Sequence, residues 1–98
     1  MTVYAISTDL MDGSKLRAIE GVRVVRPGHD LGDAELVVVD LALPGALEQA
    51  LATGARVVAY GSHVDDETLA AAEAAGAEAM PRSIFFRRLR ETGSVVDR

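Results

Sequence analysis

The chain has 98 residues, of which 49% are hydrophobic, 26% charged and 4% aromatic, and this length predicts one domain with a modest core. It contains no cysteine, which excludes disulfides, thiolate metal sites and cysteine nucleophiles and fits a reducing cytoplasm. The longest apolar runs have four residues, too few to cross a membrane, and the N-terminus has no signal-peptide pattern. We therefore expect a cytoplasmic protein with no membrane partner.

Charge is distributed unevenly along the chain. Residues 1–81 hold 5 Lys or Arg against 13 Asp or Glu, a net charge of −8, whereas residues 82–98 carry a net charge of +3. An acidic body argues against nucleic acid as a partner, because binding phosphates requires a basic face. The arginines near the C-terminus are also explained as a solvated helix face near the negative end of the helix dipole.

The first elements in chain order are a strand and a helix. Residues 3–6 form a short apolar run, and the polar residues 7–9 that follow are good N-caps for a helix over residues 10–20. Gly21 ends this predicted helix. Its expected inner side consists of Leu10, Met11, Leu16 and Ile19.

A second strand over residues 22–25 follows, and a third spans residues 35–40. The connection between them, residues 27–34, contains one proline, two glycines and two aspartates. This composition predicts a loop or at most one helical turn, so a second helix is short or missing.

The second half of the chain continues the alternation. Pro44 suits the first turn of a helix that Gly54 stops. Residues 56–60 predict a fourth strand. The alanine-rich residues 65–75 predict a helix that can approach a sheet closely.

The last elements are short. Residues 77–80 predict a fifth strand, and Ser83 is the expected cap of a helix over residues 84–89. We expect a single domain over residues 1–91 and a flexible tail over residues 92–98. Strand–helix alternation with valine-rich strands predicts a parallel sheet covered on both faces, a three-layer α/β/α architecture.

Ligands of open parallel sheets collect outside the carboxyl ends of the strands. We therefore expect the side chains that follow the strands to share one candidate site. These are Ser7, Thr8 and Asp9, then Asp40, then Gly61, Ser62 and His63, and finally Arg82 and Ser83. Such a set can bind an anion or a metal.

Each of these residues also has a structural explanation. Thr8 or Asp9 is explained equally well as a helix cap with no further role, and Ser62 as a cap of the next helix. Asp40 can accept backbone N–H groups of its own loop. Arg82 can pair with Asp40 or point to solvent.

Several enzyme classes are excluded by missing motifs. The chain has no GxGxxG or GxxxxGK[ST] loop and no HExxH. Ser62 and His63 do not form a triad, because adjacent side chains at a turn point apart and no nucleophile elbow surrounds the serine. We expect a protein without enzymatic activity.

Two segments resemble a response-regulator receiver domain, and the resemblance covers roughly residues 2–90. DAELVVVDLALPG (33–45) is similar to the receiver segment around the phospho-accepting aspartate, which Asp40 matches. RVVAYGSHVDDETLAAAEAAGAEAMPRSIF (56–85) is similar to the fourth strand, fourth helix and fifth strand of receivers. The resemblance implies a flavodoxin-like sheet of strand order 2-1-3-4-5.

The other functional positions of receivers match poorly. Ser7 and Thr8 stand where receivers hold Mg²⁺ with an acidic pair, which leaves Asp9 and Asp40 as carboxylates for a weak Mg²⁺ site. Gly61 stands at the position of the hydroxyl residue. The switch lysine and the proline after it correspond to Arg82 and Ser83.

We therefore expect a degenerate, phosphorylation-independent receiver (a pseudo-receiver) that acts in signalling as a protein-interaction module without a cofactor. Its partner, or a second copy of the chain, is expected on the face of the fourth receiver helix, fifth strand and last helix. One alternative is a receiver that is phosphorylated on Asp40 with Mg²⁺. Another is a small anion- or ligand-binding domain that uses Ser62, His63 and Arg82.

Overall fold

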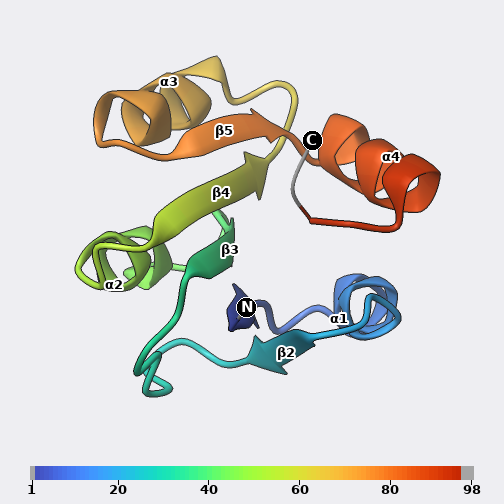
Figure 1. The fold of residues 1–98 in the computed structure, drawn as a ribbon. Helices are drawn as coiled ribbons and strands as arrows, with labels where there is room; N and C mark the ends of the chain where they lie inside the picture. The colour runs from blue at the N-terminus through green and yellow to red at the C-terminus, as the bar shows by residue number, and fades with distance from the viewer. Residues whose placement is uncertain (1, 96–98) are drawn as a thin grey trace.

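The computed structural model describes residues 2–95 (Figure 1). Five strands and four helices alternate along this part of the chain. They are β1 (Val3–Ile6), α1 (Leu10–Arg17), β2 (Val22–Val25), β3 (Leu36–Asp40), α2 (Ala46–Leu51), β4 (Arg56–Gly61), α3 (Asp66–Ala74), β5 (Glu78–Pro81) and α4 (Arg82–Thr92).

The strands form one parallel sheet of order β2-β1-β3-β4-β5, which confirms the predicted flavodoxin-like architecture. Helices α1 and α4 cover one face of the sheet, and α2 and α3 cover the other (Figure 1). The central strands are buried on both faces, as their continuous valine runs require. No helix within residues 2–95 is long and apolar enough to cross a membrane.

The helix expected to be short or missing between β2 and β3 is absent. A loop connects these strands, and Leu31 from this loop is only 4% exposed in the core on the α2/α3 face. The loop thus buries one leucine against the sheet where a helix would otherwise pack.

Helix α1 turns a different side to the sheet from the one predicted. Leu10 and Met11 are 86% and 70% exposed, so their expected burial is wrong. The buried residues are Asp12, Gly13 and Leu16, which lie on one side of the helix because of their three- and four-residue spacing. The sheet-facing side of α1 therefore carries a carboxylate.

Two helix starts also differ from the prediction. Gly45, with φ of +79°, precedes α2, so Pro44 lies outside the helix. Helix α4 begins at Arg82 after Pro81, which places Ser83 in the first turn of the helix rather than at its cap. The left-handed backbone at Gly45 is one that glycine adopts without strain.

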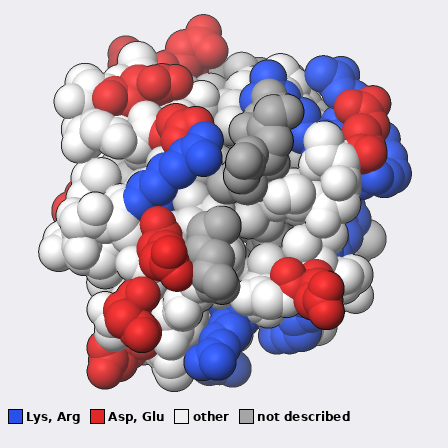
Figure 2. All heavy atoms as spheres, in the orientation of Figure 1, with Lys and Arg blue, Asp and Glu red and all other residues white. Residues whose placement is uncertain are grey.

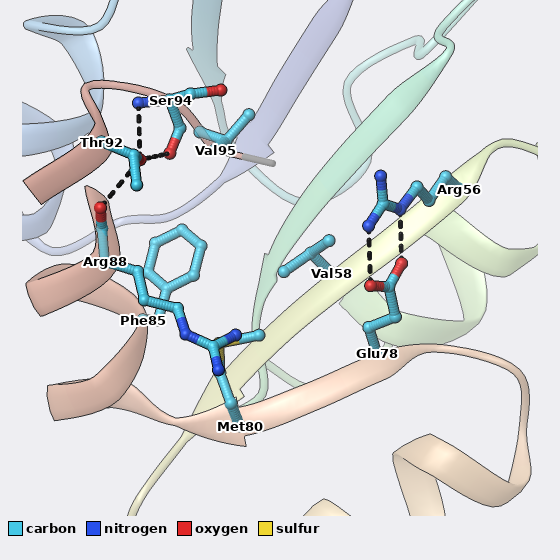
Figure 3. Close-up of a pocket in the computed structure, with 9 residues that line it drawn as sticks. All are labelled: Arg56, Val58, Glu78, Met80, Phe85, Arg88, Thr92, Ser94 and Val95. Atoms are coloured by element: carbon cyan, nitrogen blue, oxygen red, sulfur yellow. Dashed lines mark hydrogen bonds and ion pairs between the residues drawn. The ribbon is translucent and has the colours of Figure 1, made fainter. Parts of the chain in front are cut away.

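Helix α4 extends to Thr92, where Gly93 ends it with φ of +67°. The Thr92 hydroxyl donates to the Arg88 carbonyl at 2.8 Å and accepts from the Ser94 amide at 3.2 Å. Val95 packs against the core, and with these residues it borders a small cavity of about 30 Å³ under α4 (Figure 3). Residues 96–98 of the predicted tail lie outside the described residues.

Candidate functional site at the carboxyl edge of the sheet

A depression of about 500 Å³ opens at the carboxyl ends of β3, β4 and β5. It brings together most of the side chains expected there. The lining residues are Asp9, Lys15, Asp40, Ala42, Tyr60, Gly61, Ser62, His63, Arg82, Ser83 and Phe86. Ser7 and Thr8 instead border a separate hollow beside the end of β2.

The main electrostatic contact at this edge joins Arg82 to Asp12. Both terminal nitrogens of the guanidinium donate to the two carboxylate oxygens of Asp12, in a bidentate ion pair between α4 and α1. The Asp12 side chain has no exposed surface, while that of Arg82 is 44% exposed. The expected alternatives, pairing with Asp40 or an Arg82 free in solvent, are both replaced by this ion pair.

Tyr60 donates a hydrogen bond to the same carboxylate. Its hydroxyl donates to Asp12 Oδ2 at 3.3 Å, and the buried Ser7 hydroxyl is a further hydrogen-bond partner of the phenol. Burial raises the pKa of Tyr60 far above its usual value, so the phenol remains protonated. Tyr60 packs against Phe85 and Phe86 with 5.0 Å between ring centroids, which fixes its orientation.

Asp40 lies at the end of β3, half-buried at the edge of the depression. Its Oδ1 accepts the Ala42 amide at 3.0 Å, which is the structural role expected as one alternative. Partial burial raises the pKa of Asp40, the Ala42 hydrogen bond opposes the rise, and the charge of Asp12 adds to it. Neither of the two ion pairs within residues 2–95 involves Asp40.

Asp9 serves as the N-cap of α1. Its Oδ1 accepts the amides of Met11 at 2.9 Å and Asp12 at 3.0 Å. The hydrogen bond from the Asp12 amide is the main cause that lowers the pKa of Asp9, because it stabilises the charged form. One carboxylate oxygen of Asp9 is therefore already used by the helix.

The residues after β4 provide little for chemistry. Ser62 Oγ accepts the Val64 amide at 3.4 Å, and the cap of α3 is Asp65 rather than Ser62. His63 is exposed on the rim. At Gly61 a Cβ would lie 3.3 Å from Leu41 Cδ1, so a hydroxyl side chain would require Leu41 to shift.

The fold of receivers implies a Mg²⁺ ion at this edge, and the donor set fits it poorly. No group of three or more His, Asp or Glu side chains suited to a metal occurs in the described chain. Asp12 is engaged by Arg82, and Asp9 is engaged in capping. Mg²⁺ keeps several waters and is usually held by one or two carboxylates, so Asp40 and Asp9, one of whose oxygens caps α1, would form at most a weak site.

Sequence reasoning missed Asp12 and Tyr60, the two residues that bind Arg82 into the edge. A signal for Asp12 exists, since it precedes the buried Leu16 by four residues and therefore lies on the same side of the helix. Tyr60 is the last but one residue of β4, where an aromatic side chain is also explained by core packing alone.

Comparison with solved structures supports the fold independently. The chain is similar to a response regulator from Thermotoga maritima, with a TM-score of 0.57 and 17% sequence identity over 92% of this chain and 94% of that one. No protein-family model and no curated protein matches the sequence. At this identity the likeness concerns the fold, and the chain therefore has the flavodoxin-like fold of a response regulator.

Proposed function

We propose that this chain is a receiver-like signalling module that acts by binding protein and neither needs phosphorylation nor catalyses a reaction. The observation that carries this proposal is the Asp12–Arg82 ion pair. Arg82 corresponds to the switch lysine of receivers, and here its guanidinium is bound to a buried carboxylate rather than facing Asp40.

The charge balance around Asp40 supports the proposal. Phosphoryl transfer to a carboxylate brings further negative charge to the site, and catalysis depends on cations that neutralise it. The pKa of Asp40 is raised mainly by burial and further by the negative charge of Asp12, which the nearby Arg82 opposes. The edge thus disfavours a doubly charged acyl phosphate.

The coupling residues support it as well. A receiver switches when a hydroxyl after the fourth strand moves toward the phosphoryl group and packing on the far face changes. Gly61 has no hydroxyl, and Tyr60 is held by Asp12, Ser7 and two phenylalanine rings. Neither residue can therefore move in response to a phosphoryl group on Asp40 and change the packing of the far face.

The open depression beside Asp40 favours the alternative, a phospho-accepting receiver. Incubating the protein with Mg²⁺ and acetyl phosphate, followed by intact mass spectrometry, separates the two functions. We expect no phosphoryl adduct, with an Asp40→Asn variant as the matched control and a working receiver as the positive control. An adduct that forms on the native chain and is absent from Asp40→Asn would overturn the proposal.

A small-anion site is the third candidate, and the geometry opposes it. Lys15, Arg82 and Ser83 line the depression, but the carboxylates of Asp9 and Asp40 line it too. An anion would meet both of these negative charges, and the charge of Arg82 is already balanced by Asp12.

The face formed by α3, β5 and α4 is the proposed binding surface for a second copy. Most residues of strand β5 are half-buried. An acidic side chain of α3 and a basic side chain of α4 lie next to this strand. Glu73 of α3 accepts the Ala79 amide at 3.4 Å, and an Arg88 nitrogen of α4 lies 4.0 Å from Met80 Sδ. Figure 2 shows Lys and Arg gathered over α4 and acidic side chains over α3.

A two-fold axis that places α3 of each copy beside α4 of the other would set Glu73 against Arg88, because an isologous interface pairs each residue reciprocally. We expect sedimentation equilibrium to show a concentration-dependent dimer that Arg88→Glu weakens and Glu73→Arg combined with Arg88→Glu restores. Arg23→Glu, an exposed change on β2, is the matched control. A monomer at all concentrations would exclude the second copy as the partner of this face.

A further inference from the structure

A second concave surface lies between α1 and α4. It is a groove of about 310 Å³ on the sheet face opposite α2 and α3. The residues that line it, called here the α1–α4 groove, are Lys15, Ala18, Ile19, Phe86, Leu89, Arg90 and Gly93. Neither Asp40 nor any residue of β5 belongs to it.

The floor of the α1–α4 groove is apolar. Phe86 and Leu89 follow each other by three residues on α4 and are 8% and 4% exposed, with Ile19 packed beside them. The small side chain of Ala18 and the helix-ending Gly93, which has no side chain, leave space above this floor. The groove can therefore receive an apolar side chain from outside.

Each wall of the groove carries one cation. Lys15 stands on the α1 side and Arg90 in the last turn of α4. The Lys15 ammonium lies 5.1 Å from the Phe86 ring centroid, which holds the charge over the apolar floor. The two ion pairs of residues 2–95 are Arg56–Glu78 and Arg82–Asp12, so neither wall cation is paired with a carboxylate there.

The negative charge of the rest of the molecule favours the binding of acidic partners at this groove over other parts of the surface. Residues 1–81 carry a net charge of −8, whereas several basic side chains gather over α4 (Figure 2). An acidic partner is repelled by most of the surface and attracted to the α4 side, which favours one docking orientation.

We propose that the α1–α4 groove binds an acidic segment of a partner protein. One large apolar side chain of the segment packs on Ile19, Phe86 and Leu89, and carboxylates on either side pair with Lys15 and Arg90. A buried apolar anchor ringed by polar contacts is the arrangement that contributes most of the affinity in small protein interfaces. An anionic lipid surface fits less well, because each basic residue near such a surface contributes only a small attraction and the groove carries two of them.

This inference goes beyond the interaction proposed for β5 and stands whether or not Asp40 accepts a phosphoryl group. Its test is a titration of the ¹⁵N-labelled protein with a synthetic helical peptide in which one leucine is flanked by glutamates a turn away on each side. A matched peptide carries lysine in place of the glutamates. We expect saturable shifts at the amides of Ile19, Leu89 and Gly93 with the acidic peptide alone, weakened by added salt.

Charge-reversal variants test whether the peptide binds in the groove. Lys15→Glu combined with Arg90→Glu is expected to lower the affinity for the acidic peptide by about tenfold or more, because both wall charges are reversed. Arg23→Glu combined with Arg26→Glu makes the same change in net charge on exposed residues elsewhere and should leave the affinity within about twofold. Retained dispersion of the amide spectrum shows that each variant is folded.

The proposal is overturned if the acidic peptide produces no saturable shift or if the lysine peptide binds equally well. It is also overturned if the two charge-reversed variants lose affinity to the same extent, or if vesicles of anionic lipid shift the groove amides and the peptide does not. Because the readout lies at α1 and α4, it is separate from the mass measurement on Asp40.

Discussion

The two faces of the sheet are packed in different ways. On the α2/α3 face, the helix residues that are wholly buried against the strands are all alanines: Ala46, Ala50 and Ala72. The α1/α4 face is built from large side chains, including Leu16, Tyr60 and two phenylalanines. The polar network of Asp12 and Arg82 belongs to this second face as well.

The difference explains the state of the carboxyl edge. Within residues 2–95, the α2/α3 face contributes no side-chain hydrogen bond to Asp40, whose Oδ1 accepts the Ala42 amide of its own loop. On the other face, the first turn of α4 projects Arg82 toward the buried carboxylate of α1. The cation nearest to Asp40 is thus held by the tertiary packing of the large-side-chain face.

The largest expected effect comes from breaking that ion pair. Arg82→Met leaves the Asp12 charge buried without its cation, and we expect a loss of about 3–5 kcal/mol in the free energy of unfolding, measured with urea. Replacing both partners, Asp12→Leu with Arg82→Met, should recover most of this loss because no buried charge remains.

The matched control is the bidentate pair of Arg56 and Glu78, whose side chains are 45% and 50% exposed (Figure 3). Arg56→Met should cost about 0–1 kcal/mol, as exposed ion pairs do. Equal losses for Arg82→Met and Arg56→Met would contradict a special role of the Asp12 pair.

A smaller effect is expected from enlarging the alanine face. Ala72 has no exposed surface on α3, so Ala72→Leu must displace neighbouring atoms and should destabilise the fold by about 1–3 kcal/mol in urea unfolding. Ala74→Leu, at an exposed position of the same helix, should change stability by less than about 0.5 kcal/mol. A neutral Ala72→Leu would show that this face is loosely packed.

The smallest effect concerns Asp40 and depends on pH. Its folded pKa is raised by burial, so ionisation disfavours the folded state as the pH rises through the unfolded value toward the folded one. Asp40→Asn removes this charge while its amide oxygen can still accept the Ala42 amide. We expect a small rise in Tm at neutral pH that disappears below the usual aspartate range. A lower Tm at neutral pH would show that the charge of Asp40 stabilises the fold.

Much of the fold was predictable from local pattern. Valine-rich strands alternating with glycine-ended helices predicted the parallel sheet, the resemblance to receivers implied its strand order, and the Pro- and Gly-rich loop before β3 predicted the missing helix. The rule that polar groups meet at the carboxyl ends of strands placed Asp40 and Arg82 around one depression. These features depend on short stretches of chain, whose periodicity is visible in one dimension.

The inner side of α1 was not predicted correctly, for a physical reason. Leu10 and Met11 are the more hydrophobic residues, yet they are exposed in the first turn of the helix while Asp12 and Leu16 face the sheet. A buried aspartate is rare unless it is paired, so its burial follows only once its cation is known. That cation is 70 residues away in the sequence.

The sequence by itself therefore determined most of the elements, the parallel sheet and most of the side chains at its carboxyl edge, because strand and helix periods are local. The tertiary structure alone decided which carboxylate Arg82 binds, since that depends on how α1 and α4 pack across the aromatic cluster of Tyr60, Phe85 and Phe86. A hydrogen bond requires its donor–acceptor distance to lie within a few tenths of an ångström of about 2.9 Å, and only the packed helices set that distance.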